Sequence, residues 1–596
     1  MAAEASVPYG KRLLPPLITQ FAKTDPTKVY ASIPRCNEDL SQGFRDITYV
    51  TFANAINKAA WWLEGNLGIS DGTFETFAYL GPRDLRYPIL AVAAIKVGRK
   101  GLMPSLLASL EAQVHLARKT DTRAFLCAKP LVPLTEKLHA EIPESKLIVV
   151  PGLEDWLVEE EVTEYAYTKT WEEAREDPFA IYHTSGSSGI PKTVTITNEM
   201  VATIDAHHLL PPIDGITANT FMFEGRRIYG MLPIFHIVGC FMALSWGPFY
   251  NAILVLGPPD LPVTPAIAAA VHTHANISGG FYSPGLVEEL AADPAHRAGL
   301  ARLDVVAFGG APLAKNVGDW LARVGNLRPV IGSTEAGLWL TIPTVNFVPH
   351  GRREGEGEGG AGDGDPGDWE YFRFHPFFGA RLELVTENPD MYELVIERTP
   401  ESYAYTNLFK VKELPGLTEF RSKDLWTPHP DPEKREKGLW KYRGRTDDLV
   451  LLTGEVKMYS ASAEEHLRAS HEKIRAALIG GAGRSRPFLL LELADTEGAD
   501  GFGDGLKQGE EVIEINGEKK TNVNAVLDGL WPVIQEANEH LAVETHLLKE
   551  LVLIASKEKP FVRLGKGTVD RRSTFRSYEK EIESILALIF HVKKRI

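Results

Sequence analysis

Cysteine is scarce in this sequence of 596 residues. The three cysteines, Cys36, Cys127 and Cys240, are odd in number and far apart, which excludes a disulfide framework and a zinc knuckle. The first stretch, MAAEASVPYGKRLLPPLITQF, also lacks the long apolar core of a targeting signal. We therefore expect a protein of the reducing cytoplasm.

An excess of basic residues is lacking as well, because the formal net charge is -15. An acidic balance spread over this length argues against a nucleic-acid surface. Hydrophobic residues (44%) and charged residues (24%) occur in ordinary globular proportions. Since a chain of this length is too long to fold around a single hydrophobic core, we expect at least two domains.

Charged side chains are absent from one long stretch, residues 228–259, IYGMLPIFHIVGCFMALSWGPFYNAILVLGPP. Its length would suit a membrane span. However, Pro233, His236, Gly239 and Asn251 interrupt the apolar run, and no basic flank sets an orientation. We interpret the stretch as a buried core segment and expect no membrane.

Apolar runs typical of strands alternate with helical patterns along most of the chain. Helical patterns include residues 49–67 and 286–303, and the strand-like runs are TFAYLG, RAFLCA, KLIVVPG, FAIYHTSG, NAILVLG, LDVVAFGG and RPVIGSTE. This alternation predicts an α/β fold with parallel βαβ sheets.

The stretch YHTSGSSGIPK follows the strand-like run FAIYH and is rich in small residues. It is not the P-loop of nucleoside triphosphatases, which needs a lysine directly after its last glycine. A turn with hydroxyls, glycines and one cation can nevertheless wrap a pyrophosphate. The residues concerned are Thr184, Ser185, Gly186, Ser187, Ser188, Gly189 and Lys192. For SGSSG taken alone, a surface linker is the alternative.

This stretch resembles the phosphate-binding signature of the adenylate-forming superfamily, which contains acyl-CoA ligases, luciferases and adenylation domains of nonribosomal peptide synthetases. Thr193 stands where the signature usually has glycine. Further segments occur in the order of that family: LPIFHIVG, FGGAPL, VIGSTEAG, SKDLW, YRGRTDDLVLLTGE and LGKGTVDRR. The ordered signatures span residues 181–572, so chance agreement is a poor explanation.

The resemblance implies ATP and Mg²⁺ as cofactors and assigns roles to particular residues. Glu335 would hold Mg²⁺, and Thr334 would donate to the α-phosphate. Asp424 would bind the ribose hydroxyls with the help of Arg445. The segment beside adenine and the phosphates would comprise Gly310, Ala311, Pro312, Ile331, Gly332 and Ser333.

The family pattern also divides the chain. Residues 1–443 would form the adenylation core, residues 444–448 a hinge with Asp447 as its pivot, and residues 449–596 a small, mobile α+β domain. That domain would carry the catalytic lysine, Lys566. Its rotation would let one site run two reactions.

His236 narrows the expected substrate. Family members that activate α-amino acids place an aspartate after the phenylalanine of this motif, whereas here His236 follows Phe235. We therefore expect a carboxylic acid without an α-amino group, either aryl or aliphatic. The expected pocket residues are Phe235, His236, Gly279, Phe281, Ser283, Gly309 and Gly337.

A closer resemblance lies near both ends of the sequence. The segments YGKRLLPPLITQFAKTDPTKVYASIP and KGTVDRRSTFRSYEKEIESI are similar to the adenylation part of fungal synthetase-like carboxylic acid reductases. In those enzymes a phosphopantetheine carrier and a reductase domain follow, and we expect such partner domains downstream. The alternatives are a stand-alone ligase that uses coenzyme A and, less favoured, a nucleotide-binding module without catalysis.

Overall fold

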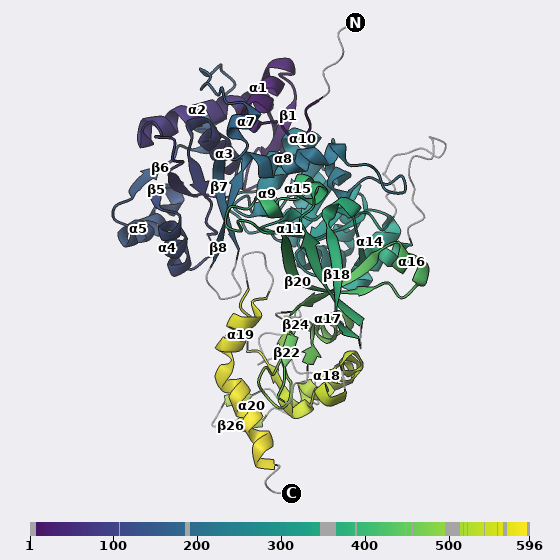
Figure 1. The fold of residues 1–596 in the computed structure, drawn as a ribbon. Coiled ribbons are helices and arrows are strands. Elements are labelled where there is room, and N and C mark those ends of the chain that lie inside the picture. Colours follow the sequence, from purple (N-terminus) through teal and green to yellow (C-terminus); the bar gives the residue numbers. More distant parts are fainter. Residues whose placement is uncertain are drawn as a thin grey trace.

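A large N-terminal part and a smaller C-terminal part make up the computed structural model (Figure 1). The structure describes residues 7–106, 108–184, 191–345, 365–387, 390–446, 449–453, 457–494, 513–515, 518–520, 523–541, 543–556, 558–563 and 569–592. This division into two unequal parts, with mixed α/β structure, is the predicted fold class.

One six-stranded sheet carries the expected phosphate segment. Its order is β6 (Lys146–Val149), β5 (Thr122–Cys127), β3 (Thr76–Leu80), β4 (Lys100–Leu102), β7 (Pro178–Thr184) and β8 (Lys192–Thr197). All neighbours are parallel except β7 and β8. Helix α2 (Tyr49–Leu67) precedes the first of these strands, and the helices between the strands include α3 (Arg86–Val97), α4 (Leu110–Lys119) and α5 (Val132–Glu141). The predicted strands and the predicted helix over 49–67 are confirmed.

A second sheet has seven strands. Their order is β13 (Leu327–Val330), β12 (Val305–Gly309), β11 (Gly279–Tyr282), β9 (Arg227–Gly230), β10 (Ile253–Val255), β1 (Val29–Pro34) and β2 (Phe44–Thr48). Only β1 and β2 pair in antiparallel fashion. The carboxyl ends of β9, β11, β12 and β13 therefore share one edge, where ligands usually bind in parallel sheets.

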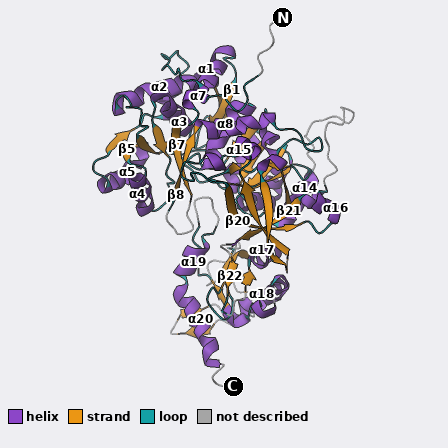
Figure 2. Cartoon of the chain, in the orientation of Figure 1, coloured by secondary structure: helices purple, strands orange, loops and turns teal. Residues whose placement is uncertain are grey.

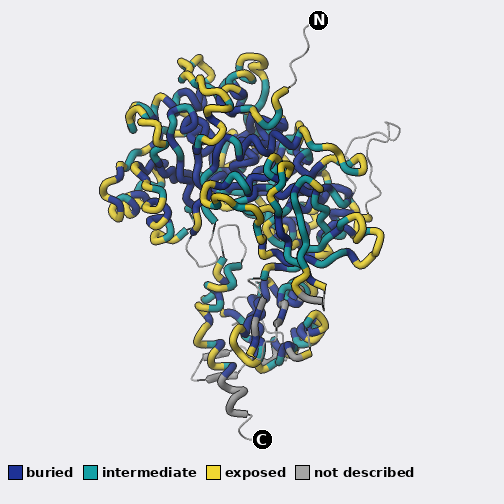
Figure 3. Tube along the Cα trace, in the orientation of Figure 1, coloured by how far each residue is buried: buried dark blue, intermediate teal, exposed yellow. Residues whose placement is uncertain are grey.

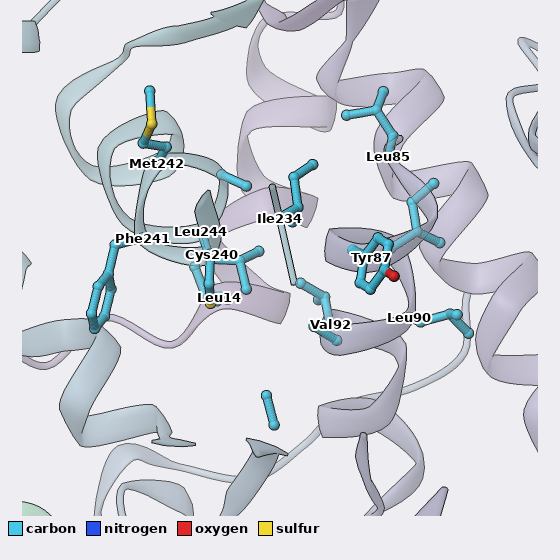
Figure 4. Close-up of a cluster of buried hydrophobic side chains, with 14 of the residues drawn as sticks. Leu14, Leu85, Tyr87, Leu90, Val92, Ile234, Cys240, Phe241, Met242 and Leu244 are labelled. Carbon is cyan, nitrogen blue, oxygen red and sulfur yellow. The ribbon is translucent and has the colours of Figure 1, made fainter. Parts of the chain in front are cut away.

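The uncharged stretch from 228 to 259 is a buried core segment, as predicted. It contains β9, α9 (Ile237–Phe241), the π-helical turn η5 (Met242–Trp246), α10 (Gly247–Tyr250) and β10. Its side chains lie opposite those of α3 in one apolar cluster (Figure 4). Within the described residues, no helix is long and apolar enough to cross a membrane.

The third sheet is antiparallel, which the strand-helix alternation did not predict. Its order is β16 (Thr341–Ile342), β17 (Tyr371–Phe374), β21 (Leu439–Arg445), β20 (Glu419–Pro428), β19 (Asp390–Glu397) and β18 (Ala380–Glu387). Trp339 and Trp426, both almost fully buried, lie in the apolar cluster beneath it. This sheet brings Asp424 and Arg445 onto neighbouring strands.

The predicted helical segment 286–303 is two helices, α12 (Pro284–Ala292) and α13 (Pro294–Ala301). Asp293 ends the first and caps the second, since its carboxylate accepts the N–H of Ala295 at 2.8 Å. Pro294 cannot donate a hydrogen bond to the preceding turn, which explains the break. The next helix, α14 (Lys315–Val324), follows β12.

The C-terminal part is α+β. Its three-stranded sheet has the order β24 (Ile474–Gly480), β25 (Phe488–Leu493) and β28 (Val552–Ile554), and two hairpins join β22 (Leu449–Leu451) to β23 (Lys457–Tyr459) and β26 (Ile513–Ile515) to β27 (Glu518–Lys520). The helices are α17 (Ala461–Ser470), α18 (Val523–Ala537), α19 (Arg571–Ser577) and α20 (Glu579–Val592) (Figure 2).

Separate apolar cores stabilise the two parts. The clusters of the C-terminal part begin at Val450, whereas the last aromatic side chain packed on an N-terminal cluster is Tyr442. Buried residues are concentrated in the interior of each part (Figure 3). The hinge bounds 444–448 stay a prediction, and Asp447 lies outside the described residues.

Candidate active site

The predicted phosphate segment connects two antiparallel strands. Thr184, half-buried at the end of β7, pairs with the exposed Lys192 at the start of β8. Thr184 and Lys192 therefore stand opposite each other at the base of the connection. The predicted residues between them, Ser185, Gly186, Ser187, Ser188 and Gly189, lie outside the described residues.

His236 stands at the start of α9. Its Nδ1 accepts the N–H of Val238 at 3.3 Å, so the neutral imidazole carries its proton on Nε2. Gly239 is required here, because a Cβ atom would approach the Cα of Ile234 to 2.8 Å. The tight turn leaves Phe235 buried and His236 half-buried.

Thr334 and Glu335 lie at the tip of a short hairpin. Its strands are β14 (Gly332–Ser333) and β15 (Gly337–Leu338), and the Ser333 hydroxyl accepts the N–H of Ala336 at 3.1 Å. A Thr-Glu pair is by itself more typical of a helix start, but here it is a strand turn. Both residues are half-buried, which leaves their polar groups accessible to a ligand.

Mg²⁺ is commonly bound through one or two protein carboxylates together with phosphate oxygens. The half-buried carboxylate of Glu335 fits that requirement. Among the residues that the structure describes, no group of three or more His, Cys, Asp or Glu residues could hold a metal ion. A magnesium site here would therefore depend on phosphate oxygens of the nucleotide.

The loop after β12 contains the predicted adenine segment Gly310, Ala311 and Pro312. Gly310 adopts a φ of 88°, a left-handed conformation that favours glycine. Gly309, the residue before it, packs closely against β13, since a Cβ atom there would lie 2.6 Å from the carbonyl oxygen of Val330. The turn thus keeps β12 and β13 closely packed where both strands end.

Several predicted pocket residues come together and one does not. A Cβ atom on Gly309 would lie 3.4 Å from the ring of Phe281, and one on Gly337 would lie 3.3 Å from the ring of Phe241 in α9. Ser283 follows the carboxyl end of β11. Gly279, by contrast, begins that strand, at its opposite end.

Ile331 lies partly buried against the Trp339 and Trp426 cluster. Its carbonyl oxygen accepts the N–H of Trp339 at 3.0 Å. Its aliphatic side chain thus packs against aromatic rings of that cluster.

Asp424 and Arg445 face each other on β20 and β21. Lys423 has a φ of 63°, and the pairing of β20 with both neighbours shifts register near it. Such bulges re-aim side chains and are frequent beside active sites. The Asp424 N–H donates to the Ser422 hydroxyl at 3.0 Å, and the Asp424 side chain is 11% exposed.

The two parallel sheets are connected close to the site. The hydroxyl of Tyr182 on β7 donates to the carbonyl oxygen of Ile234 at 3.3 Å, two residues before His236. Lys566, the predicted catalytic lysine, lies outside the described residues. Arg563 and Val569, which form an isolated antiparallel β-bridge, precede and follow it in the sequence.

Sequence reasoning missed two residues that shape this region. His183 accepts the N–H of Ser105 on its Nε2 at 3.0 Å, which joins the end of β7 to the segment after β4, and burial lowers its pKa. Glu288 of α12 accepts the N–H of Ala314 at 2.8 Å, directly after the adenine segment. No local pattern marks either contact, because both partners are distant in sequence.

Comparisons with known proteins agree with this geometry. Residues 21–365 match the family model "AMP-binding enzyme", and residues 446–588 match "AMP-binding enzyme C-terminal domain". The chain therefore belongs to the AMP-binding enzyme family, whose members form acyl-adenylates. It is an enzyme of the adenylate-forming class that uses ATP to activate an acid.

Two similar curated proteins come from fungi. The chain is 30% identical, over 97% of its length, to the isocyanide synthase-NRPS hybrid crmA of Aspergillus fumigatus. It is 28% identical, over 98% of its length, to a carboxylic acid reductase of Neurospora crassa. These matches span only 34% and 51% of the two relatives, in the adenylation part that the sequence predicted.

Solved structures show the same fold. The anthranilate CoA ligase AuaEII in complex with anthranoyl-AMP superposes with a TM-score of 0.66 at 15% identity. The match covers 97% of this chain and 98% of that one. The likeness extends over both the large N-terminal and the smaller C-terminal part.

Proposed function

We propose that this chain activates an aryl or aliphatic carboxylic acid as its acyl-adenylate and passes the acyl group to a phosphopantetheine thiol. One observation carries the proposal: the hairpin of Thr334 and Glu335, the helix start at His236 and the adenine segment all lie at the carboxyl edge of the second sheet. Asp424 and Arg445 add a paired carboxylate and guanidinium from the third sheet.

In the first half-reaction, a carboxylate oxygen of the acid bonds to the α-phosphorus of ATP, and the bond to pyrophosphate breaks. Lys192 and Thr184 bind the departing phosphates through charge and a hydroxyl donor. Glu335 would hold Mg²⁺, which neutralises charge on the phosphate oxygens when bound. Thr334 donates a hydrogen bond to the α-phosphate, where negative charge develops.

Asp424 accepts hydrogen bonds from the two ribose hydroxyls, and Arg445 orients the Asp424 carboxylate. Gly310, Ala311 and Pro312 present little bulk beside the purine. In the second half-reaction, a thiolate bonds to the acyl carbon and AMP leaves. Residues 449–596 turn about Asp447 between the two steps, and Lys566 takes part in the first.

The substrate class follows from position 236. An α-ammonium group needs a carboxylate partner when it is buried, and His236 stands at the position of that carboxylate. The imidazole of His236 would contact the carboxylate of the acid at this position.

ATP–pyrophosphate exchange with a panel of acids tests the proposal. Benzoate-like and simple aliphatic acids should support exchange, and standard α-amino acids should not. Exchange with an amino acid, but none with its deaminated analogue, would contradict the assignment of the substrate class.

The proposal also covers which thiol accepts the acyl group and which domains accompany this chain. Similarity to the carboxylic acid reductase of Neurospora crassa favours a carrier and a reductase domain downstream. The fold of the anthranilate CoA ligase favours, as the second candidate, a ligase that uses free coenzyme A. Thioester formation measured with free coenzyme A and with a pantetheinylated carrier domain separates the two. The cytoplasm remains the predicted location.

A further inference from the structure

An ion pair joins the C-terminal part to the N-terminal part. Arg468 of α17 donates from Nη1 to both carboxylate oxygens of Glu288 in α12, at 2.7 and 2.6 Å. The two residues are 180 positions apart in the sequence. Their side chains are 24% and 22% exposed, so water screens the contact only in part.

The same carboxylate holds the loop expected beside adenine. Glu288 Oε1 also accepts the backbone N–H of Ala314 at 2.8 Å. Ala314 is buried and follows Gly310, Ala311 and Pro312 by a few positions. One side chain thus binds both the C-terminal part and the end of this loop.

The surroundings of the ion pair are also charged. Glu465 precedes Arg468 on α17 by one turn, and burial raises the pKa of its carboxyl. The charges that act on Glu465 from the N-terminal side are Lys441, Glu370 and Arg443. The Lys441 ammonium is itself paired with Glu370 at 2.6 Å. Charges of both signs from both parts therefore surround the ion pair in this orientation of α17.

We propose that Glu288 is a positioning residue that couples the orientation of the C-terminal part to the adenine loop and thereby favours the half-reaction that uses this orientation. The inference rests on the proposed function for its catalytic consequence. A contact that exists in one orientation only shifts the equilibrium toward that orientation. Charge-assisted bonds from arginine to a carboxylate are the strong kind and depend on geometry.

Two substitutions each remove the ion pair and keep an acceptor for the Ala314 N–H. Arg468→Gln removes the charge from α17 and leaves the bond to Ala314. Glu288→Gln keeps an acceptor oxygen for Ala314 and loses the ion pair. Lys473→Gln, on the exposed turn after α17, is the matched control. Equal melting temperatures establish that each variant folds, and Arg468→Gln suffices if Glu288→Gln does not fold.

Hydrogen exchange tests the coupling without any activity. In Arg468→Gln, peptides covering residues 461–470 should exchange about 3- to 10-fold faster, as expected when one local contact is lost. Peptides covering residues 309–318, in the N-terminal part, should also exchange faster. The double variant Glu288→Arg with Arg468→Glu should restore protection of 461–470 but not of 309–318, because an arginine cannot accept the Ala314 N–H.

The half-reactions test the consequence. Arg468→Gln should slow one half-reaction, the one that uses this orientation, about 5-fold, the upper end for an exposed ion pair. The other half-reaction should stay near the parent rate, as measured by adenylate formation and by thioester formation from preformed acyl-adenylate. Unchanged exchange at 309–318 in Arg468→Gln, or equal slowing of both half-reactions, would overturn the proposal. Absence of adenylation by the parent with every acid would refute the proposed function alone, because the hydrogen-exchange result would still stand.

Discussion

Asp424 and Arg445 form a register pair on the antiparallel strands β20 and β21, with Asp424 Oδ1 3.9 Å from Arg445 Nη1. The distance is too long for a direct hydrogen bond and short enough for charge attraction. A carboxylate has two oxygens and accepts several hydrogen bonds at once, so Asp424 can also accept from a ligand. Ribose hydroxyls would be suitable donors.

Asp424→Asn should raise the KM for ATP about 10- to 100-fold, because a hydrogen bond to a charged group contributes roughly 1.5–3 kcal/mol. The measurement is pyrophosphate exchange at varied ATP. A second measurement uses 2′-deoxy-ATP, against which the parent should discriminate and the variant should discriminate less. Glu419→Gln, on the same strand and paired with Arg381, is the control. If the variant discriminates as the parent does, Asp424 does not bind the ribose.

The hairpin of Thr334 and Glu335 gives a second prediction. A Cβ atom at Gly332 would overlap the carbonyl oxygen of Gly337 across the hairpin. Gly332→Ala should displace the tip and slow adenylate formation by about 10²-fold, since small misplacements of reacting groups have effects of that size. Stopped-flow adenylate formation measures it. Gly529→Ala, in α18 with open space around the glycine, should leave the rate unchanged. If Gly332→Ala forms the adenylate at the parent rate, the hairpin takes no part in this step.

A buried histidine makes stability depend on pH. Burial lowers the pKa of His207 to about 4, and its ring bonds Thr220 Oγ1 at 2.7 Å and the Tyr405 carbonyl oxygen at 2.9 Å. Since the unfolded pKa is about 6.5, the stabilisation is fully present above pH 6.5 and is lost as the pH falls toward 4. The linkage amounts to about 3 kcal/mol.

His207→Gln should therefore flatten the fall in melting temperature between pH 6.5 and 4, even though the variant melts lower at pH 7.5. Differential scanning at several pH values provides the comparison. His115→Gln, at an exposed position of α4, should keep the slope of the parent. Identical slopes for His207→Gln and the parent would mean that folding does not lower the pKa of His207.

The strands of the two parallel sheets could be predicted where the apolar runs were long, as for β3, β5 and β7. Strand β4 was not predicted, because it has only three residues, KGL. The antiparallel sheet was not predicted either. Its strands carry alternating charged residues such as Arg381 and Glu383, and this pattern resembles that of a solvated loop. Those charges are satisfied across strands instead, as in the pair of Arg381 and Glu397 at 2.7 Å.

The candidate site was predictable where short motifs mark it. Glu335 and Asp424 are predicted because their neighbours match a family pattern, and their roles stay predictions; the structure shows how a hairpin and a bulge present them. Glu288 could not be found in this way, because its partners Ala314 and Arg468 are 26 and 180 positions away. Such contacts depend on how helices pack, which local sequence does not encode.

The two-orientation mechanism is tested by Lys566 and Asp447 together. If Lys566 supplies charge only during adenylation, Lys566→Ala should slow adenylate formation by about 10²–10³, the usual effect of removing one electrostatic stabiliser. With chemically made acyl-adenylate and a pantetheine thiol, the same variant should form thioester at close to the parent rate. Asp447→Pro should do the reverse, because proline restricts the backbone rotation that a pivot needs. Equal damage to both half-reactions by Lys566→Ala, at an unchanged melting temperature, would show that the lysine acts in both steps and that the two-orientation mechanism is wrong.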